Sequence, residues 1–106
     1  MIYEMRIYKL QPGKVGVFLK LFEENRKILF RKGAALGKLV GWWYTDIGPV
    51  DEVVQIYAFE NMSQWEKVRK AQEKDAVTRD FRLKTKPMVQ SQNSRFMTPA
   101  SFSPLK

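Results

Sequence analysis

The chain has 106 residues, 44% of them apolar, and a formal net charge of +8 at neutral pH. It contains no cysteine and no histidine, which excludes disulfides, Cys-ligated zinc, Ser–His triads, His-ligated zinc and His-bound haem. A chain of this length and apolar content is expected to form one domain, 1–106, with an extended tail at 98–106.

The sequence also bears on location and partners. No stretch approaches the roughly 20 apolar residues of a membrane helix. Strand-like residues begin at Ile2, so we expect no targeting segment and a cytoplasmic location. The positive net charge suggests a nucleic acid as a partner. Lys and Arg are absent, however, between Leu39 and Glu60. They concentrate in 14–38 and 67–86, where they are typical of the solvated faces of helices.

The first half of the chain predicts a strand, a helix and a hairpin. Residues 2–9 alternate as in a strand, and a turn follows at 11–14. The hairpin has strands at 36–47 and 53–59 around the Gly48-Pro49 turn. A helix from Val15 to about Arg31, with Gly33 as a stop, is indicated by apolar residues at helical spacing: Val15, Phe18, Leu19, Phe22 and Leu29.

The second half predicts a helical region and a last strand. Asn61 or Ser63 can cap the helix, and Glu66 completes a capping-box spacing with Ser63. A break is expected near Asp75, and Pro87 ends the helical region. A polar fourth strand follows at 88–97. A core stripe is expected from Phe18, Phe22, Trp65 and Phe81.

The element order βαββαβ predicts an α+β, ferredoxin-like fold. Connection rules give an antiparallel sheet in the order 4-1-3-2, with both helices on one face. The helices are expected on the more apolar face, formed by Tyr3, Met5 and Ile7 with Val54, Ile56 and Ala58.

The opposite face is too aromatic to remain bare in water. It is expected to carry Glu4, Arg6, Tyr8, Val53, Gln55, Tyr57 and Phe59, together with one of the neighbouring tryptophans Trp42 and Trp43. Three partners fit this face: a second copy of the chain, a nucleic acid, or a small ligand. RNA-recognition modules use the open face of the same fold, but their aromatic motif is absent from "DEVVQIYAF", and Asp51 and Glu52 would repel phosphate. We therefore disfavour nucleic acid.

Three segments carry a resemblance to a known family. "MIYEMRIYKLQPGKVGVFLKLFEE", "GKLVGWWYTDIGPVDEVVQIYAFENM" and "PASFSPLK" together resemble the NIPSNAP family from the first strand to the last residue. Members are similar to dimeric α+β barrels, in which two ferredoxin-like subunits pair sheet to sheet. The resemblance implies a homodimer through the sheet face, for which the candidate residues are Glu4, Arg6, Tyr57, Phe59 and Phe102.

The resemblance to the wider barrel group implies a small-molecule enzyme, but members of that group catalyse several different reactions. Its relatives include cofactor-independent monooxygenases, haem-degrading enzymes and small isomerases. The chain departs from the family where members read Val-Val-His-aliphatic-Trp-Ala-Tyr, because "VVQIYAF" has Gln55 and Tyr57 in place of the His and Trp. Gln55 cannot shuttle protons near neutral pH, which weakens the case for an enzyme.

The candidate ligand-binding residues keep a structural alternative each. Arg6 is able to bind a ligand carboxylate or to form an ion pair with Glu4 or with an acid of the partner. Tyr8 and Tyr57 are able to orient a substrate or to make structural hydrogen bonds. Trp43 and Trp42 fit a pocket wall, the core or the dimer seam, and Gly41 leaves room for a neighbouring ring or backbone. Gln55 completes this set.

No cofactor is expected. Asp46 and Asp51 flank the Gly48-Pro49 turn but have no third ligand, so no metal site is expected. The sequence thus predicts a homodimer that binds or converts a small apolar or aromatic molecule without a cofactor. The alternative is a non-catalytic interaction or scaffold module.

Overall fold

The computed structural model describes residues 1–31 and 37–106 and shows an α+β fold. Its four strands form one antiparallel sheet in the order β2-β3-β1-β4, which confirms the predicted order. The expected second helix is divided in two, as the break near Asp75 predicted. The elements are β1 (Ile2–Leu10), α1 (Val15–Leu29), β2 (Lys38–Tyr44), β3 (Glu52–Phe59), α2 (Met62–Lys74), α3 (Ala76–Thr85), the 3-10 turn η1 (Lys86–Met88) and β4 (Val89–Met97).

The ends of several elements differ from the predicted ones. The stop at Gly33 and the start of the second strand at Leu36 lie outside the described residues. β2 ends at Tyr44 rather than at Ile47, and a loop closed by the left-handed Asp51 (φ 59°) leads into β3. Long loops of this kind are poorly marked by side-chain alternation, because the residues that leave the sheet keep their β-branched or aromatic character.

Each of the two later helices is capped at its N-terminus by a single side chain, and neither has a capping box. Asn61 Oδ1 accepts a hydrogen bond from Gln64 N at 2.9 Å and caps α2, whereas Ser63 lies inside the helix. The expected box between Ser63 and Glu66 is therefore wrong. Asp75 follows the last residue of α2 and caps α3 through the backbone N–H of Thr78.

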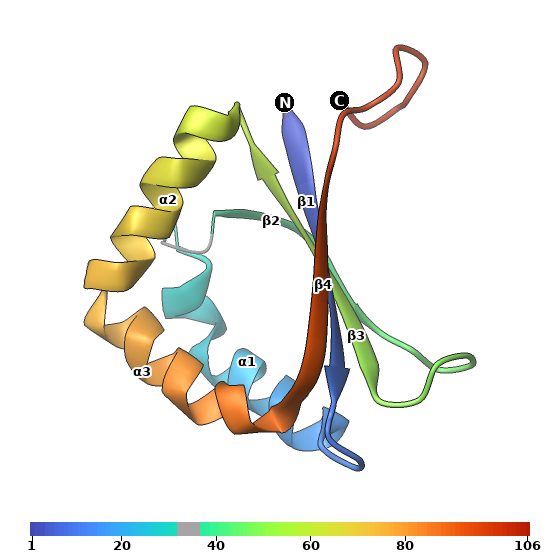
Figure 1. Ribbon diagram of the computed structural model, residues 1–106, viewed down its shortest axis with the longest axis vertical. Helices are drawn as coiled ribbons and strands as arrows, with labels where there is room; N and C mark the ends of the chain where they lie inside the picture. The colour runs from blue at the N-terminus through green and yellow to red at the C-terminus, as the bar shows by residue number, and fades with distance from the viewer. Residues whose placement is uncertain (32–36) are drawn as a thin grey trace.

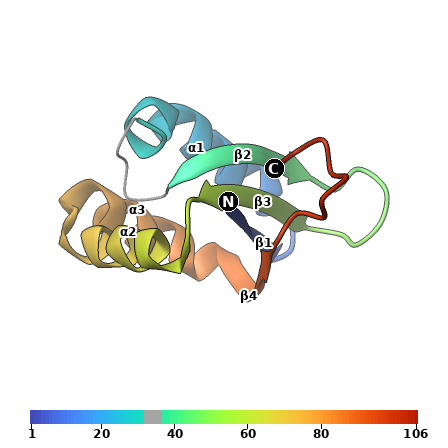
Figure 2. The ribbon, with the colours of Figure 1, turned by 90° about the horizontal axis from the view of Figure 1, so that it is seen from above.

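All three helices lie on one face of the sheet (Figure 1 and Figure 2). The core between them is aromatic: Phe22 packs edge-on against Phe81, with ring centroids 4.9 Å apart. The ring centroids of Phe18 and Phe22 are 5.1 Å apart. Trp65 packs against the buried cluster that contains Phe81. The predicted aromatic stripe is thus the core.

The face that the helices cover is the one expected to be open. Tyr8 and Leu10 of β1 pack with Phe18, and Tyr57 and Phe59 of β3 pack in the second cluster. The face assignment from sequence was wrong because it counted aliphatic residues, whereas aromatic rings on the helices select aromatic rings on the sheet. The same covered face carries Glu4, Arg6, Val53 and Gln55.

The other face of the sheet has an aliphatic centre, and no helix of residues 1–31 or 37–106 covers it (Figure 1). Met5, Ile7, Val54 and Ile56 lie on this open face, partly exposed, together with Trp43, which is 51% exposed. The neighbouring Trp42 points to the helix side of the sheet, where its ring centroid lies 5.0 Å from that of Phe22. The two tryptophans thus lie on opposite faces, as the strand pattern predicted.

Gly41 makes room for the ring of Trp43. A Cβ atom built on Gly41 would lie 2.1 Å from Trp43 Cη2, so any side chain there would displace the indole. The predicted role of Gly41 beside a neighbouring ring is confirmed.

The chain beyond β4 leaves the sheet as a looped tail (Figure 1). Phe102 in this tail is 89% exposed and does not fold over the body of the chain. No helix in 1–31 or 37–106 is both long and apolar enough to cross a membrane.

Candidate ligand-binding site

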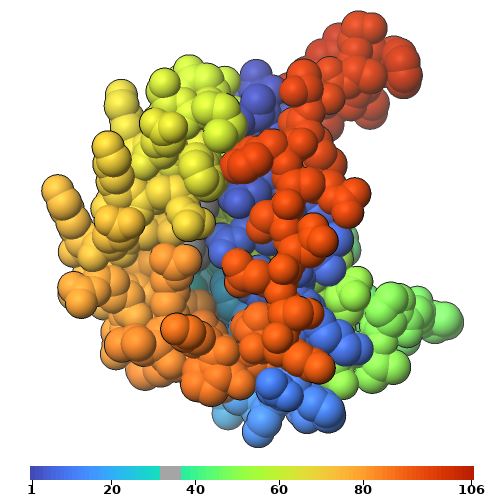
Figure 3. All heavy atoms as spheres, in the orientation of Figure 1, coloured from blue at the N-terminus to red at the C-terminus, as the bar shows by residue number. Residues whose placement is uncertain are grey.

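A cavity of about 630 Å³ lies between the sheet and the helices. Phe18 and Phe22 of α1 and Phe81 of α3 form its apolar wall, and β1, β3, β4, η1 and other residues of α3 supply the rest of the lining. The surface is hollowed between α3 and β4, and deeper parts of the chain are visible there (Figure 3). Its volume falls within the roughly 300–1,000 Å³ usual for small-molecule sites.

Arg6 and Gln55 form the polar floor of the cavity. They are directly opposite each other in the β1–β3 ladder, so both side chains leave the same face at adjacent points. Arg6 is 8% exposed and Gln55 is 1% exposed. Arg6 Nε and Gln55 Nε2 are buried and have no hydrogen-bond partner in the described part of the chain.

Tyr57 fixes the orientation of the Gln55 amide. Its hydroxyl donates to Gln55 Oε1 at 2.6 Å, which leaves the NH₂ group of Gln55 as the free end. Burial raises the pKa of Tyr57 well above its ordinary value, although the nearby positive charge of Arg6 opposes the shift. The phenol therefore stays protonated and remains a donor at neutral pH.

Two aromatic rings flank the Arg6 guanidinium. Its Cζ lies 5.3 Å from the centroid of Tyr8 and 6.0 Å from that of Tyr57, within cation–π range. Burial raises the pKa of Tyr8 as well. Both rings thus stay neutral and present their faces to the cation.

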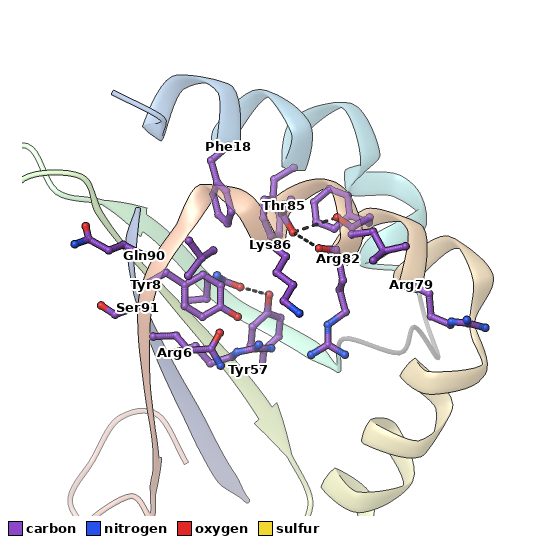
Figure 4. Close-up of a pocket in the computed structure, with 16 residues that line it drawn as sticks. Arg6, Tyr8, Phe18, Tyr57, Arg79, Arg82, Thr85, Lys86, Gln90 and Ser91 are labelled. Carbon is purple, nitrogen blue, oxygen red and sulfur yellow. Dashed lines mark hydrogen bonds between the residues drawn. The ribbon is translucent and has the colours of Figure 1, made fainter. Parts of the chain in front are cut away.

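Two further cations, missed by sequence reasoning, line the cavity from the helix side. Arg82 and Lys86 reach from α3 and η1 toward Arg6 and Tyr57, whereas Arg79 points away from them (Figure 4). Desolvation, and then the positive charges of Arg6 and Arg69, lower the pKa of Arg82. The four-residue spacing of Arg82 and Lys86, one helical turn, is the signal in the sequence for this pair, but the same spacing is typical of a solvated helix face.

The predicted ligand-binding residues separate into two places. Arg6, Tyr8, Gln55 and Tyr57 line the cavity, whereas Trp43 lies on the open face, away from it.

The predicted dimer contacts do not lie where the sequence placed them. Glu4, Arg6, Tyr57 and Phe59 are buried on the helix side, so these four cannot form a sheet-to-sheet contact through the open face. Among the five predicted contact residues, Phe102 alone is accessible to a partner. The expected Glu4–Arg6 ion pair is also wrong, since within 1–31 and 37–106 no carboxylate lies within 4.0 Å of the Arg6 guanidinium.

Asp51 has a local structural contact in the loop before β3. Its Oδ1 accepts a hydrogen bond from Gly13 N at 3.3 Å, which links this loop to the β1–α1 turn. Across the described ranges, no three Asp, Glu, His or Cys side chains come together as a metal site would require.

The lining gives the site a clear chemical character. Its polar groups are mostly donors, and none of its lining residues is an Asp, Glu or His. Tyr8 and Tyr57 keep their protons at neutral pH, so neither can act as a general base there. The arrangement is suited to binding and orienting a molecule rather than to removing a proton from it.

Sequence comparison places this chain beside one family. The sequence model of the NIPSNAP family matches residues 3–104. Protein NipSnap homolog 3A of Homo sapiens is 36% identical over 74 residues, which is 69% of this chain and 28% of that protein. Protein NipSnap homolog 2 of Mus musculus is 29% identical over 105 residues, covering 99% of this chain and 36% of that protein. The chain thus spans about a third of the length of these relatives.

A solved structure agrees over the whole chain. Protein Atu4242 from Agrobacterium tumefaciens superposes with a TM-score of 0.91 at 32% identity, covering 100% of both chains. The ferredoxin-like architecture described above is therefore shared with a protein that is similar in sequence as well.

Proposed function

Because this chain belongs to the NIPSNAP family, whose model spans nearly all of it, we propose that it binds a small, largely apolar or aromatic molecule. The molecule occupies the cavity between the sheet and α1 and α3. The protein acts as a homodimer and needs no metal or organic cofactor.

One observation carries the proposal. A cavity of about 630 Å³ has an aromatic wall and a floor with two buried, unpaired donors, Arg6 Nε and Gln55 Nε2. A buried donor without a partner costs about 1–3 kcal/mol, and more for a charged group. A bound molecule that presents acceptor atoms to these two donors would remove this cost.

The open face supports the homodimer. Met5, Ile7, Val54 and Ile56 form an aliphatic surface on the two central strands, with Trp43 at its β2 side. A contiguous apolar surface of this kind usually marks an interaction site. A second copy of the same face is a matching cover, because an isologous contact requires only that the surface be complementary to itself. Phe102 stays a candidate contact from the exposed tail.

A thermal-shift screen tests ligand binding. The screen uses aromatic, acyl and quinone-like compounds, and we expect at least one class to raise the unfolding temperature. A ligand at 100 times its dissociation constant adds about 2.7 kcal/mol of stability.

A pair of variants on neighbouring β4 residues locates the binding. Gln92 lies opposite Tyr8 and lines the cavity, whereas Asn93 lies opposite Ile7 on the other face. Gln92→Trp should abolish the shift by filling the cavity, and Asn93→Trp should keep it. If no compound class stabilises the protein, the scaffold alternative takes the place of the binding function.

A further inference from the structure

The unmatched groups of the cavity floor are all of one kind. Arg6 Nε and Gln55 Nε2 are both donors, and both belong to side chains more than nine-tenths buried. The Tyr57 hydroxyl already donates to the oxygen of the Gln55 amide, so the group of that amide left without any partner is its NH₂. The group that completes this floor must therefore be an acceptor.

The charges around the floor indicate that the acceptor is negative. Arg82 and Lys86 extend toward Arg6, and no acid lines the cavity (Figure 4). Glu4 lies on the same face of β1, two residues from Arg6, but makes no ion pair with it. The buried Nε of this guanidinium has no acceptor in the described part of the chain, and the rings of Tyr8 and Tyr57 stabilise the positive charge without accepting that hydrogen bond.

The placement of the two donors fits a planar group with two oxygens. Arg6 and Gln55 are adjacent across one ladder, so one oxygen can accept from the guanidinium and the other from the amide. Arg82 and Lys86 are exposed and lie at the opening, and Arg82 already donates to Gln72 Oε1 at 3.3 Å. A phosphate ester would bring a third terminal oxygen, and the two side chains at the buried end are placed to meet two oxygens.

We infer that the cavity binds a small carboxylate with an apolar or aromatic body. Its carboxylate bridges Arg6 and Gln55, and its body lies against Phe18, Phe22 and Phe81. This inference rests on the proposed binding function and names the chemical class of the ligand.

Calorimetry with a matched series of compounds tests it. The probes are 3-phenylpropionate, its uncharged amide 3-phenylpropionamide, and 3-phenylpropyl phosphate, with octanoate as a second carboxylate. We expect both carboxylates to bind about tenfold or more tightly than the amide, because charge-assisted hydrogen bonds are the stronger ones. We expect the phosphate ester to bind more weakly than 3-phenylpropionate.

Three variants assign the binding to the cavity floor. Arg6→Met should weaken carboxylate binding about tenfold or more while leaving amide binding unchanged. Lys86→Gln, a change on an exposed side chain, should weaken it less and make it less dependent on salt. Arg79→Gln is the control, because Arg79 lines the same cavity from α3 but points away from Arg6 (Figure 4).

The outcomes separate the inference from the proposed function. Equal binding of amide and carboxylate, or unchanged carboxylate binding by Arg6→Met, overturns the carboxylate and leaves the cavity as an apolar site. Tighter binding of the phosphate ester, lost in Arg6→Met, also overturns it. Failure of every probe, together with failure of the wider screen, overturns the binding function and the inference together.

Discussion

At the scale of single residues, Tyr57 joins the core to the site. Its ring packs in the cluster that contains Leu29 and Phe81, and its hydroxyl orients the Gln55 amide. The phenol is buried, and burial raises its pKa. The same side chain therefore links the stability of the fold at high pH to the arrangement of donors in the cavity.

Tyr57→Phe should flatten the loss of stability at high pH. The folded-state pKa of Tyr57 is raised above the unfolded value of about 10, so its contribution is complete below pH 10 and falls as the pH rises further. Urea unfolding between pH 7 and pH 11 measures this. At pH 7 the variant should lose about 1–3 kcal/mol, because Gln55 Oε1 is left without its donor.

Tyr44→Phe is the control for this substitution, because Tyr44 is 54% exposed. Its alkaline profile should follow that of the unaltered protein. A Tyr57→Phe profile that also follows it would mean that Tyr57 does not remain neutral in the folded state.

At the scale of elements, Asp75 separates α2 from α3 and so sets the position of the cavity's helix-side lining. Its carboxylate accepts hydrogen bonds from the backbone N–H and the hydroxyl of Thr78. Arg31 approaches it from the end of the α1 region, with Nη2 3.7 Å from Oδ1. The cap thus fixes the start of the helix that carries Phe81 and Arg82.

Asp75→Ala should lower the unfolding temperature at pH 7 and reduce its dependence on acid pH. The hydrogen bond from the Thr78 side chain is the main cause of the lowered pKa of Asp75. A lowered folded-state pKa gives stability above the unfolded value of about 3.9, and this is lost as the pH falls through the folded-state pKa. Thermal unfolding between pH 2 and pH 7 follows the effect.

Asp80→Ala is the matched control, since Asp80 lies on the same helix in an exposed pair with Lys84. Exposed pairs of this kind contribute little. An Asp80→Ala loss as large as that of Asp75→Ala would show that general charge, not the cap, controls the stability of α3.

The sequence predicted the elements better than the faces. Periodic apolar residues located α1 and the strands, and the break at Asp75 was visible from its polar character. The choice between Asn61 and Ser63 as the N-cap depends on where the backbone changes from extended to helical angles. The spacing of residues in the sequence does not determine that position. The choice of sheet face was wrong because both faces are apolar, and only the aromatic rings of Phe18, Phe22 and Phe81 decide between them.

The candidate site was predicted in part for the same reason. Polar groups on buried strands are costly unless they have a partner, and this makes Arg6, Tyr8, Gln55 and Tyr57 predictable as site residues. That argument does not depend on which face the helices cover. Arg82 and Lys86 were missed because a cation on an amphipathic helix has the same pattern whether it faces solvent or the opening of a cavity.

At the scale of the whole molecule, the aliphatic open face determines the expected assembly. Ile56 lies on the central strand β3, between Met5 on one side and Gly41 on the other. Ile56→Glu should give a folded monomer, because each subunit would bury an unpaired charge in the seam at a cost of several kcal/mol. Sedimentation velocity at micromolar concentration measures the mass, and circular dichroism checks the fold.

Ile47→Glu is the control, because Ile47 is 98% exposed in the loop between β2 and β3. It should remain dimeric. A dimer that survives Ile56→Glu would have its interface elsewhere, and a monomer of the unaltered chain would remove the homodimer altogether.

The cavity lies on the helix side of the sheet, opposite the face that we propose for the dimer contact. A dimer joined through the opposite face would therefore carry two complete chambers, one on each outer flank. Saturation would require one ligand molecule per subunit, and filling the first chamber would leave the affinity of the second unaltered. Ile56→Glu, although it separates the subunits, should still take up one equivalent.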